Sequence, residues 1–256
     1  MRFGLIIEYD GAGFHGSQLQ ANLRTVQGVL EMALSSAFEA PVRPRLASRT
    51  DTGVHALGQV AAFDAETGMD GDTIRKALNY FLPEDVRVRC SQRVADKFDP
   101  RRDASWREYA YTLNDAQAQP AIHRGTEVHV RERLDEAAMA EAARELVGAH
   151  DFKAFAGPAT PNDAPTVRRV DAAQVARDGE RVRFSIRANA FLHQQIRRTA
   201  AALVSVGTGR MTSEAFGELL RSGSKGEAKR PLAPHGLCLE RISYEGEGPC
   251  GLPAAA

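Results

Sequence analysis

Residues 47–56 read Ala47-Ser48-Arg49-Thr50-Asp51-Thr52-Gly53-Val54-His55-Ala56. A single carboxylate, that of Asp51, stands between small residues and a glycine, two positions after Arg49. One interpretation is an Asx-type turn that joins two strands, with Gly53 adopting the backbone angles that the turn needs. The other is a short loop that presents the Asp51 carboxylate to a ligand, with Arg49 nearby to keep it ionised. The residues alone leave both interpretations open.

Strands and helices alternate on both sides of this segment. Before it, apolar residues alternate over residues 3–9 as in a half-buried strand, and those of residues 26–38 recur at helical spacing after Thr25, a residue type that caps helices. After it, the patterns predict strands at 59–63, 86–90, 109–113, 127–130, 167–175, 182–188 and 237–244, and helices at 74–81, 139–147 and 192–206.

This order of elements predicts an α+β fold built from two α/β halves of related layout. The expected domains are an N-terminal half at residues 1–103, which carries the Asp51 loop, a C-terminal half at 104–246 and a mobile tail at 247–256.

Composition is that of a globular protein. The chain has 256 residues, 43% of them hydrophobic, and no stretch approaches the ~18 uninterrupted apolar residues of a membrane span. Glu8 follows the first apolar residues too soon for a signal-peptide core, so we expect a cytoplasmic protein. The cysteines Cys90, Cys238 and Cys250 are odd in number and widely spaced, which argues against a disulfide framework and against a thiolate zinc site.

Charge is balanced overall but not locally. The 33 basic and 33 acidic residues give a net charge of zero, which first suggests that nucleic acid is not a partner. Residues 181–213, however, hold six arginines and no acid, a second basic cluster spans residues 221–230, and acids predominate in residues 127–151. The two basic segments are therefore candidates for binding backbone phosphates. For the arginines of the strand at 182–188, a solvated outer face is the alternative.

Several common catalytic motifs are absent from the sequence. It contains no P-loop, no Gly-x-Gly-x-x-Gly after a strand, no His-Glu-x-x-His and no Gly-x-Ser-x-Gly. Nucleoside-triphosphate, dinucleotide and zinc chemistry therefore lose most of their support.

The segment 49–56 closely resembles the catalytic motif of the TruA-type tRNA pseudouridine synthases, whose common form is Gly-Arg-Thr-Asp-Ala-Gly-Val-His. Other segments between about residue 5 and residue 244 also resemble segments of this family, and they occur in the same order as in the family. They are residues 9–18, 25–31, 79–83, 98–111, 150–155, 191–197 and 233–237. The sequence departs from the family at Ser17, where Trp is usual, at Ser48, where Gly is usual, and at Thr52, where Ala is usual. After Arg197, the usual Asn and Gly are replaced by Arg198 and Ala201.

The resemblance implies an isomerase that detaches uracil from C1′ of a uridine in tRNA, rotates it and reattaches it through C5, without a metal or redox cofactor. It also implies uridines 38–40 of the anticodon stem-loop as the substrate, a homodimer, and a pseudouridine synthase fold whose two sheets join around a central catalytic cleft.

The resemblance assigns roles to four residues. Asp51 acts on the ribose, as a nucleophile or as a base at C2′, and Arg197 is its ion-pair partner. Tyr109 lies against the flipped uracil, and Arg49 fills the vacated space or holds the flipped nucleotide. The alternatives are a phosphate contact for Arg197, a core aromatic for Tyr109, whose strand face Tyr111 shares, and a surface cation for Arg49.

Other interpretations also follow from the sequence. His55 is a candidate general base, but a supporting hydrogen bond within the loop fits the family reaction better. A non-catalytic RNA-binding protein on the same fold is the alternative from another functional class. A carboxylate-dependent hydrolase would need a second acid in a matching motif, and the sequence shows none.

Overall fold

The computed structural model describes residues 1–228, 230–246 and 248–251. The chain forms two compact units: unit 1 comprises Met1–Arg107 and the chain from Cys238 onward, and unit 2 comprises Glu108–Leu237. The boundary between the units, at 107/108, therefore lies a few residues after the expected boundary at 103/104. The last strand, expected in the C-terminal half, belongs instead to unit 1, because it pairs with a strand of the first hundred residues.

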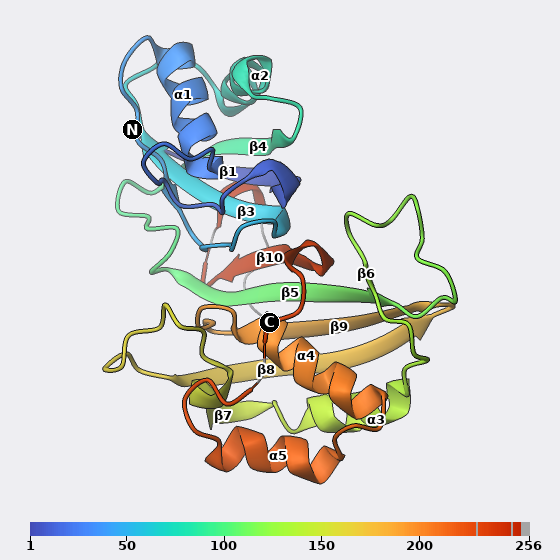
Figure 1. Cartoon of the computed structure of the whole chain (residues 1–256). Coiled ribbons are helices and arrows are strands. Elements are labelled where there is room, and N and C mark those ends of the chain that lie inside the picture. The colour runs from blue at the N-terminus through green and yellow to red at the C-terminus, as the bar shows by residue number, and fades with distance from the viewer. Residues whose placement is uncertain (229, 247, 252–256) are drawn as a thin grey trace. The chain divides into compact units, whose positions relative to one another are not determined.

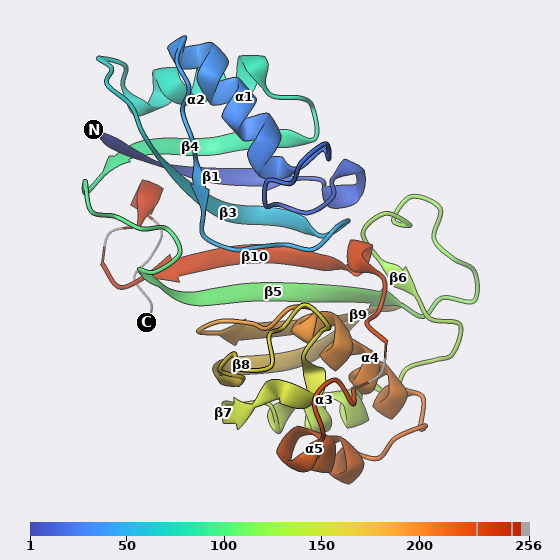
Figure 2. The ribbon, with the colours of Figure 1, turned by 60° about the vertical axis from the view of Figure 1, so that its left-hand side comes forward.

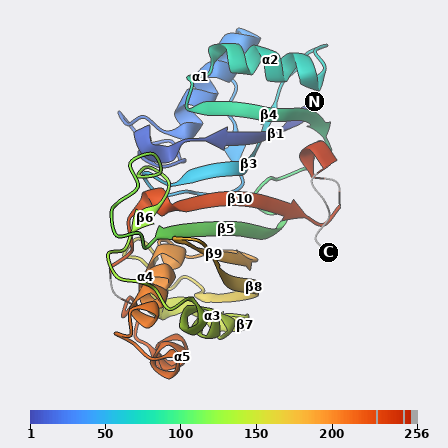
Figure 3. The same cartoon turned by 90° about the vertical axis from the view of Figure 1, so that its right-hand side faces the viewer.

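Unit 1 is a sheet in the order β4-β1-β3-β10. These strands are β1 (Arg2–Tyr9), β3 (His55–Asp64), β4 (Val86–Val94) and β10 (Leu237–Tyr244). β1 pairs antiparallel with β3 and β4, the short β2 (Arg45–Leu46) pairs antiparallel with β3, and β10 runs parallel to β3 (Figure 3). Helices α1 (Val26–Phe38) and α2 (Gly71–Phe81) lie side by side over this sheet (Figure 1).

Unit 2 contains strands in the order β5-β9-β8-β7, with three helices packed beside them (Figure 2). Its strands are β5 (Ala104–Asn114, entering from unit 1), β6 (Val128–His129), β7 (Gly148–Asp151), β8 (Val167–Asp178) and β9 (Arg181–Ala188). Its helices are α3 (Glu136–Arg144), α4 (Gln195–Gly207) and α5 (Ser213–Ser222). Short 3-10 turns occur at Gly11–Gly13, Phe152–Phe155, Pro234–Gly236 and Pro249–Gly251.

The predicted α+β class is confirmed, and the structure contains every predicted strand and helix. Thr25 caps α1 as expected, because its side chain accepts a hydrogen bond from the amide of Gly28. The sequence patterns did not predict α5, whose buried face is short: Phe216, Gly217 and Leu220. Within the described part of the chain, no helix is long and apolar enough to cross a bilayer.

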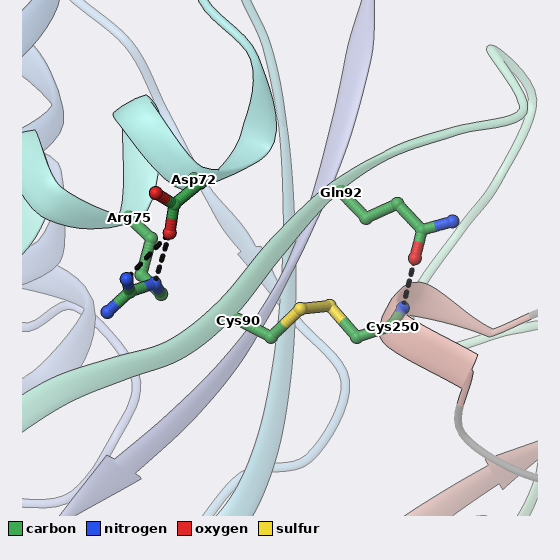
Figure 4. Close-up of a disulfide and its surroundings, with 5 residues drawn as sticks. All are labelled: Asp72, Arg75, Cys90, Gln92 and Cys250. Carbon is green, nitrogen blue, oxygen red and sulfur yellow. Dashed lines mark hydrogen bonds and ion pairs between the residues drawn. A yellow bond between two sulfur atoms is a disulfide. The ribbon is translucent and has the colours of Figure 1, made fainter.

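The expectation that the cysteines form no disulfide is wrong, since Cys90 and Cys250 are bonded to each other (Figure 4). They lie 160 residues apart in sequence, but their Cα atoms are 6.3 Å apart, within the range that a disulfide spans. The segment after β10 reaches β4, where the Cys250 amide donates to Gln92 Oε1 at 2.7 Å and Pro249 is buried. Sequence spacing carries no information about this return of the chain. Residues 248–251 of the expected mobile tail are thus attached to β4, and the rest of that tail lies outside the described residues.

Opening the disulfide is expected to destabilise the protein. A cross-link that closes so long a loop restricts the unfolded chain, and its loss typically costs about 2–4 kcal/mol of unfolding free energy. Denaturant unfolding with and without a thiol reductant measures this difference. Cys250→Ser should abolish the response to reductant, and Cys238→Ser, outside the disulfide, should keep it. An equal response in all three proteins would contradict the role of the bond.

Candidate active site

The Asp51 loop connects β2 to β3 in unit 1. Thr50 is buried, Asp51 is half-buried and Arg49 is exposed. The Val54 amide donates to the Asp51 carbonyl at 3.1 Å, and Gly53 has a φ of 78°, a backbone conformation that glycine adopts at little cost. The predicted turn is therefore present. It leaves the Asp51 side chain partly accessible, so the turn and the presentation of a carboxylate are compatible.

Buried side chains hold the residues just before Asp51. Gln59, fully buried in β3, accepts from the Ser48 amide at 3.1 Å and donates to the Ser48 carbonyl at 2.8 Å. The Thr50 amide donates to Ser17 Oγ at 2.9 Å, and the Thr50 carbonyl accepts from the Ser17 amide at 3.1 Å. Tyr9 at the end of β1 completes the set, since its hydroxyl lies 2.8 Å from Thr50 Oγ1. Sequence reasoning assigned no role to Gln59 or to the Tyr9 hydroxyl; a polar Gln59 beside the apolar run at 60–63 was the available signal.

Glycines let the preceding segment approach the loop. Gly16 has a φ of 86°, and a Cβ there would lie 2.9 Å from the Thr50 carbonyl oxygen. A Cβ on Gly11 would lie 2.0 Å from the Val54 carbonyl oxygen, which is a severe overlap. The amide of Gly53 donates to the Phe14 carbonyl at 3.3 Å. Segment 11–17 and the Asp51 loop therefore form one closely packed structure.

His55 supports this structure from the start of β3. The Gly11 amide donates to His55 Nδ1 at 3.1 Å, and Asp10 Oδ1 lies 3.1 Å from the same nitrogen. Only 8% of the residue is exposed. The Nδ1 atom of His55 thus holds the turn at residues 10–11, which agrees with the interpretation of His55 as a hydrogen-bonding support and not as a general base.

Arg197 lies in the first turn of α4 in unit 2. Its Nε donates to the Leu232 carbonyl at 2.8 Å, and the Leu232 amide donates back to the Arg197 carbonyl at 3.2 Å. The segment before the 3-10 turn Pro234–Gly236 thus fixes the base of this guanidinium. The neighbouring Arg198 donates to the Ala228 carbonyl at 2.8 Å, and burial, followed by the charge of Arg197, lowers the pKa of its guanidinium.

Tyr109 and Tyr111, which sequence alternation could not tell apart, differ in β5. The Tyr111 hydroxyl donates to the Ala233 carbonyl at 2.6 Å, its side chain is fully buried, and this burial raises its pKa. Tyr109 is 5% exposed and packs edge-on against Phe191 with ring centroids 5.3 Å apart. Tyr111 is therefore a structural residue, and Tyr109 occupies a different environment in the same unit.

Several arginines of the basic segments of unit 2 are paired with acids, contrary to their appearance in the sequence. Arg181 lies 2.6 Å from Glu127, Arg210 lies 2.5 Å from Glu132, and Arg187 pairs with Asp171. Arg221 in the second cluster lies 3.2 Å from Glu145. Three of these acids come from residues 127–151, the acidic stretch of the sequence. Lys229 lies outside the described residues. Folding thus neutralises part of the expected row of unopposed charges.

Each of the two units contains half of the predicted site. Asp51 and Arg49 lie on one loop of unit 1, whereas Tyr109 and Arg197 lie on β5 and α4 of unit 2. No group of three or more His, Cys, Asp or Glu side chains able to hold a metal occurs among the residues described.

Comparison with known proteins identifies the family. The family model described as tRNA pseudouridine synthase matches residues 5–101 and 142–245. A tRNA pseudouridine synthase A from Geobacter sulfurreducens (strain ATCC 51573 / DSM 12127 / PCA) is 38% identical over 94% of this chain and 98% of its own length. Another, from Methylobacterium sp. (strain 4-46), is 40% identical over 97% and 99%. A third, from Caulobacter sp. (strain K31), is 38% identical over 96% and 99%. The chain therefore belongs to the tRNA pseudouridine synthase family and is an isomerase.

Proposed function

We propose that this protein converts uridines 38–40 in the anticodon stem-loop of tRNA to pseudouridine, with Asp51 as the catalytic carboxylate. The observation that carries the proposal is the Asp51 loop. It closely resembles the family's catalytic motif, and buried and part-buried hydrogen bonds hold the residues before a partly accessible carboxylate. Such preorganisation is what a reaction at one sugar carbon requires.

The reaction is an isomerisation in which atoms balance without a co-substrate. The bond from C1′ to N1 breaks, the uracil rotates, a bond from C1′ to C5 forms, and the proton lost from C5 is balanced by the one gained at N1. Asp51 attacks C1′ or removes a proton at C2′. The target nucleotide must leave its stack first, at a cost of a few kcal/mol.

The other site residues have supporting roles in this proposal. Arg197 pairs with Asp51 and keeps the carboxylate ionised. Tyr109 contacts the uracil, and its buried position against Phe191 limits the orientations of its ring. Arg49, exposed beside Asp51, holds the flipped nucleotide or fills the space that it leaves.

A homodimer and a cytoplasmic location complete the proposal. Sedimentation of the purified protein tests the dimer. The cytoplasm keeps thiols reduced, so the Cys90–Cys250 disulfide is expected to form only under oxidising conditions.

Loss of the Asp51 carboxylate should abolish the reaction. Asp51→Asn keeps the size of the side chain but cannot act as nucleophile or base, so we expect no detectable pseudouridine in an unmodified tRNA transcript, with tRNA affinity and thermal unfolding near those of the parent protein. Asp96→Asn, an exposed carboxylate in the turn after β4, is the matched control and should be fully active. Activity in Asp51→Asn would refute the proposal, and inactivity of the parent protein would favour a non-catalytic RNA-binding protein.

Tyr109→Phe should lower turnover strongly while the protein stays folded. Tyr111→Phe is the matched control, because it loses the hydrogen bond to Ala233 and should cost about 1 kcal/mol of unfolding free energy with a smaller effect on turnover. Single-turnover rates and thermal unfolding separate the two effects. A near-normal rate for Tyr109→Phe would assign that residue to packing.

Affinity for tRNA should fall as salt rises, because cations that bind phosphates release counterions. Arg49→Gln should reduce the slope of log affinity against log salt by about one unit. Arg221→Gln is the control. Since Glu145 already neutralises this exposed arginine, its loss should change the slope less. Equal slopes for parent protein and Arg49→Gln would exclude a phosphate contact by Arg49.

A further inference from the structure

The geometry points to Ser17 as a positioning residue for the Asp51 carboxylate. We infer that the hydroxyl and amide of Ser17 fix the two peptide units that precede Asp51. This inference rests on the proposed function, since it assumes that Asp51 performs the reaction. Ser17 is the position at which the sequence departs from the Trp usual in the family.

Ser17 contacts the loop on both sides of Arg49. Its Oγ accepts from the Thr50 amide at 2.9 Å and donates to the Ser48 carbonyl at 3.4 Å. Its amide donates to the Thr50 carbonyl at 3.1 Å, which belongs to the peptide unit that also contains the Asp51 nitrogen. One residue therefore sets the orientation of the backbone that leads directly into Asp51.

Because the hydrogen bonds between Ser17 and Thr50 are buried, their loss costs more stability than the loss of exposed ones. Ser17 is 0% exposed, and Thr50 is 8% exposed. Removal of the hydroxyl leaves the Thr50 amide without its acceptor in a place that water reaches poorly, which costs more than loss of an exposed hydrogen bond. The loop then regains a partner for this amide only by moving, and that movement displaces Asp51.

In this chain the position is filled by a small side chain that accepts a hydrogen bond. A Trp side chain offers one N–H donor and no acceptor oxygen, so it cannot bind the Thr50 amide as Ser17 does. Gly16, whose own Cβ would lie 2.9 Å from the Thr50 carbonyl oxygen, brings the Ser17 backbone close enough for these bonds. Ser17 and Gly16 together give this chain its own way of holding the catalytic loop.

The test is Ser17→Ala compared with Ser91→Ala. Ser91 is also buried, at 8% exposure, but its hydroxyl has no hydrogen-bond partner among the described residues, so its removal controls for loss of a buried serine oxygen. For Ser17→Ala we expect the single-turnover rate of pseudouridine formation to fall about tenfold, as small displacements of catalytic groups do, with tRNA Kd within twofold of the parent protein. Ser91→Ala should match the parent in both measurements.

Tyr9→Phe provides an independent variant if Ser17→Ala does not fold. It keeps the ring in the core and removes the hydroxyl that binds Thr50 Oγ1, so we expect the same pattern of a lower rate at unchanged Kd. The positioning role would be overturned if the folded Ser17→Ala variant kept a single-turnover rate within twofold of the parent protein. It would also be overturned if tRNA affinity fell by the same factor as the rate. Activity in Asp51→Asn would instead overturn the proposed function, so the two failures are distinguishable.

Discussion

The structure around Asp51 depends on one constraint: backbone polar groups of the loop before it lie in buried or part-buried positions and must find partners inside the protein. A buried amide or carbonyl without a partner costs about 1–3 kcal/mol. In this chain Gln59 satisfies both polar backbone atoms of Ser48, and Ser17 satisfies both of those of Thr50. The loop therefore has one favourable conformation, and the position of the carboxylate follows from it. The turn interpretation of residues 47–56 and the proposed catalytic role of Asp51 are thus compatible.

Charge pairing explains how a neutral chain can belong to a family of tRNA enzymes. The arginines at 181–213 and the acids at 127–151 are separate in sequence, but folding places several of them in contact, as in the pairs of Arg181 with Glu127 and Arg210 with Glu132. Local sequence counts therefore overstate the positive surface. Neutralised arginines contribute little to indiscriminate binding of polyanions, and the proposed tRNA contact therefore falls on exposed cations such as Arg49.

Much of the fold could be predicted because the patterns are local. Alternation in β1, helical spacing in α1 and the Thr25 cap depend on neighbours within a few residues, and all are present in the structure. The motif around Asp51 indicates the loop that we propose to be catalytic. What could not be predicted depends on contacts between distant segments: the Cys90–Cys250 disulfide, the return of β10 to unit 1, and the hydrogen bonds from Ser17 to Thr50. Ser17 was noticed only as a departure from the family, and its partners became clear from the folded chain.

The measurement that tests the central claim most directly is tritium release from an unmodified tRNA transcript labelled at C5 of uridine. Formation of the new bond at C5 expels the hydrogen held there, so the account predicts release by the purified protein without added metal or cofactor. It also predicts that release stops when uridines 38–40 of the transcript are replaced by cytidine. No release from the labelled transcript, or undiminished release from the substituted one, would contradict the account.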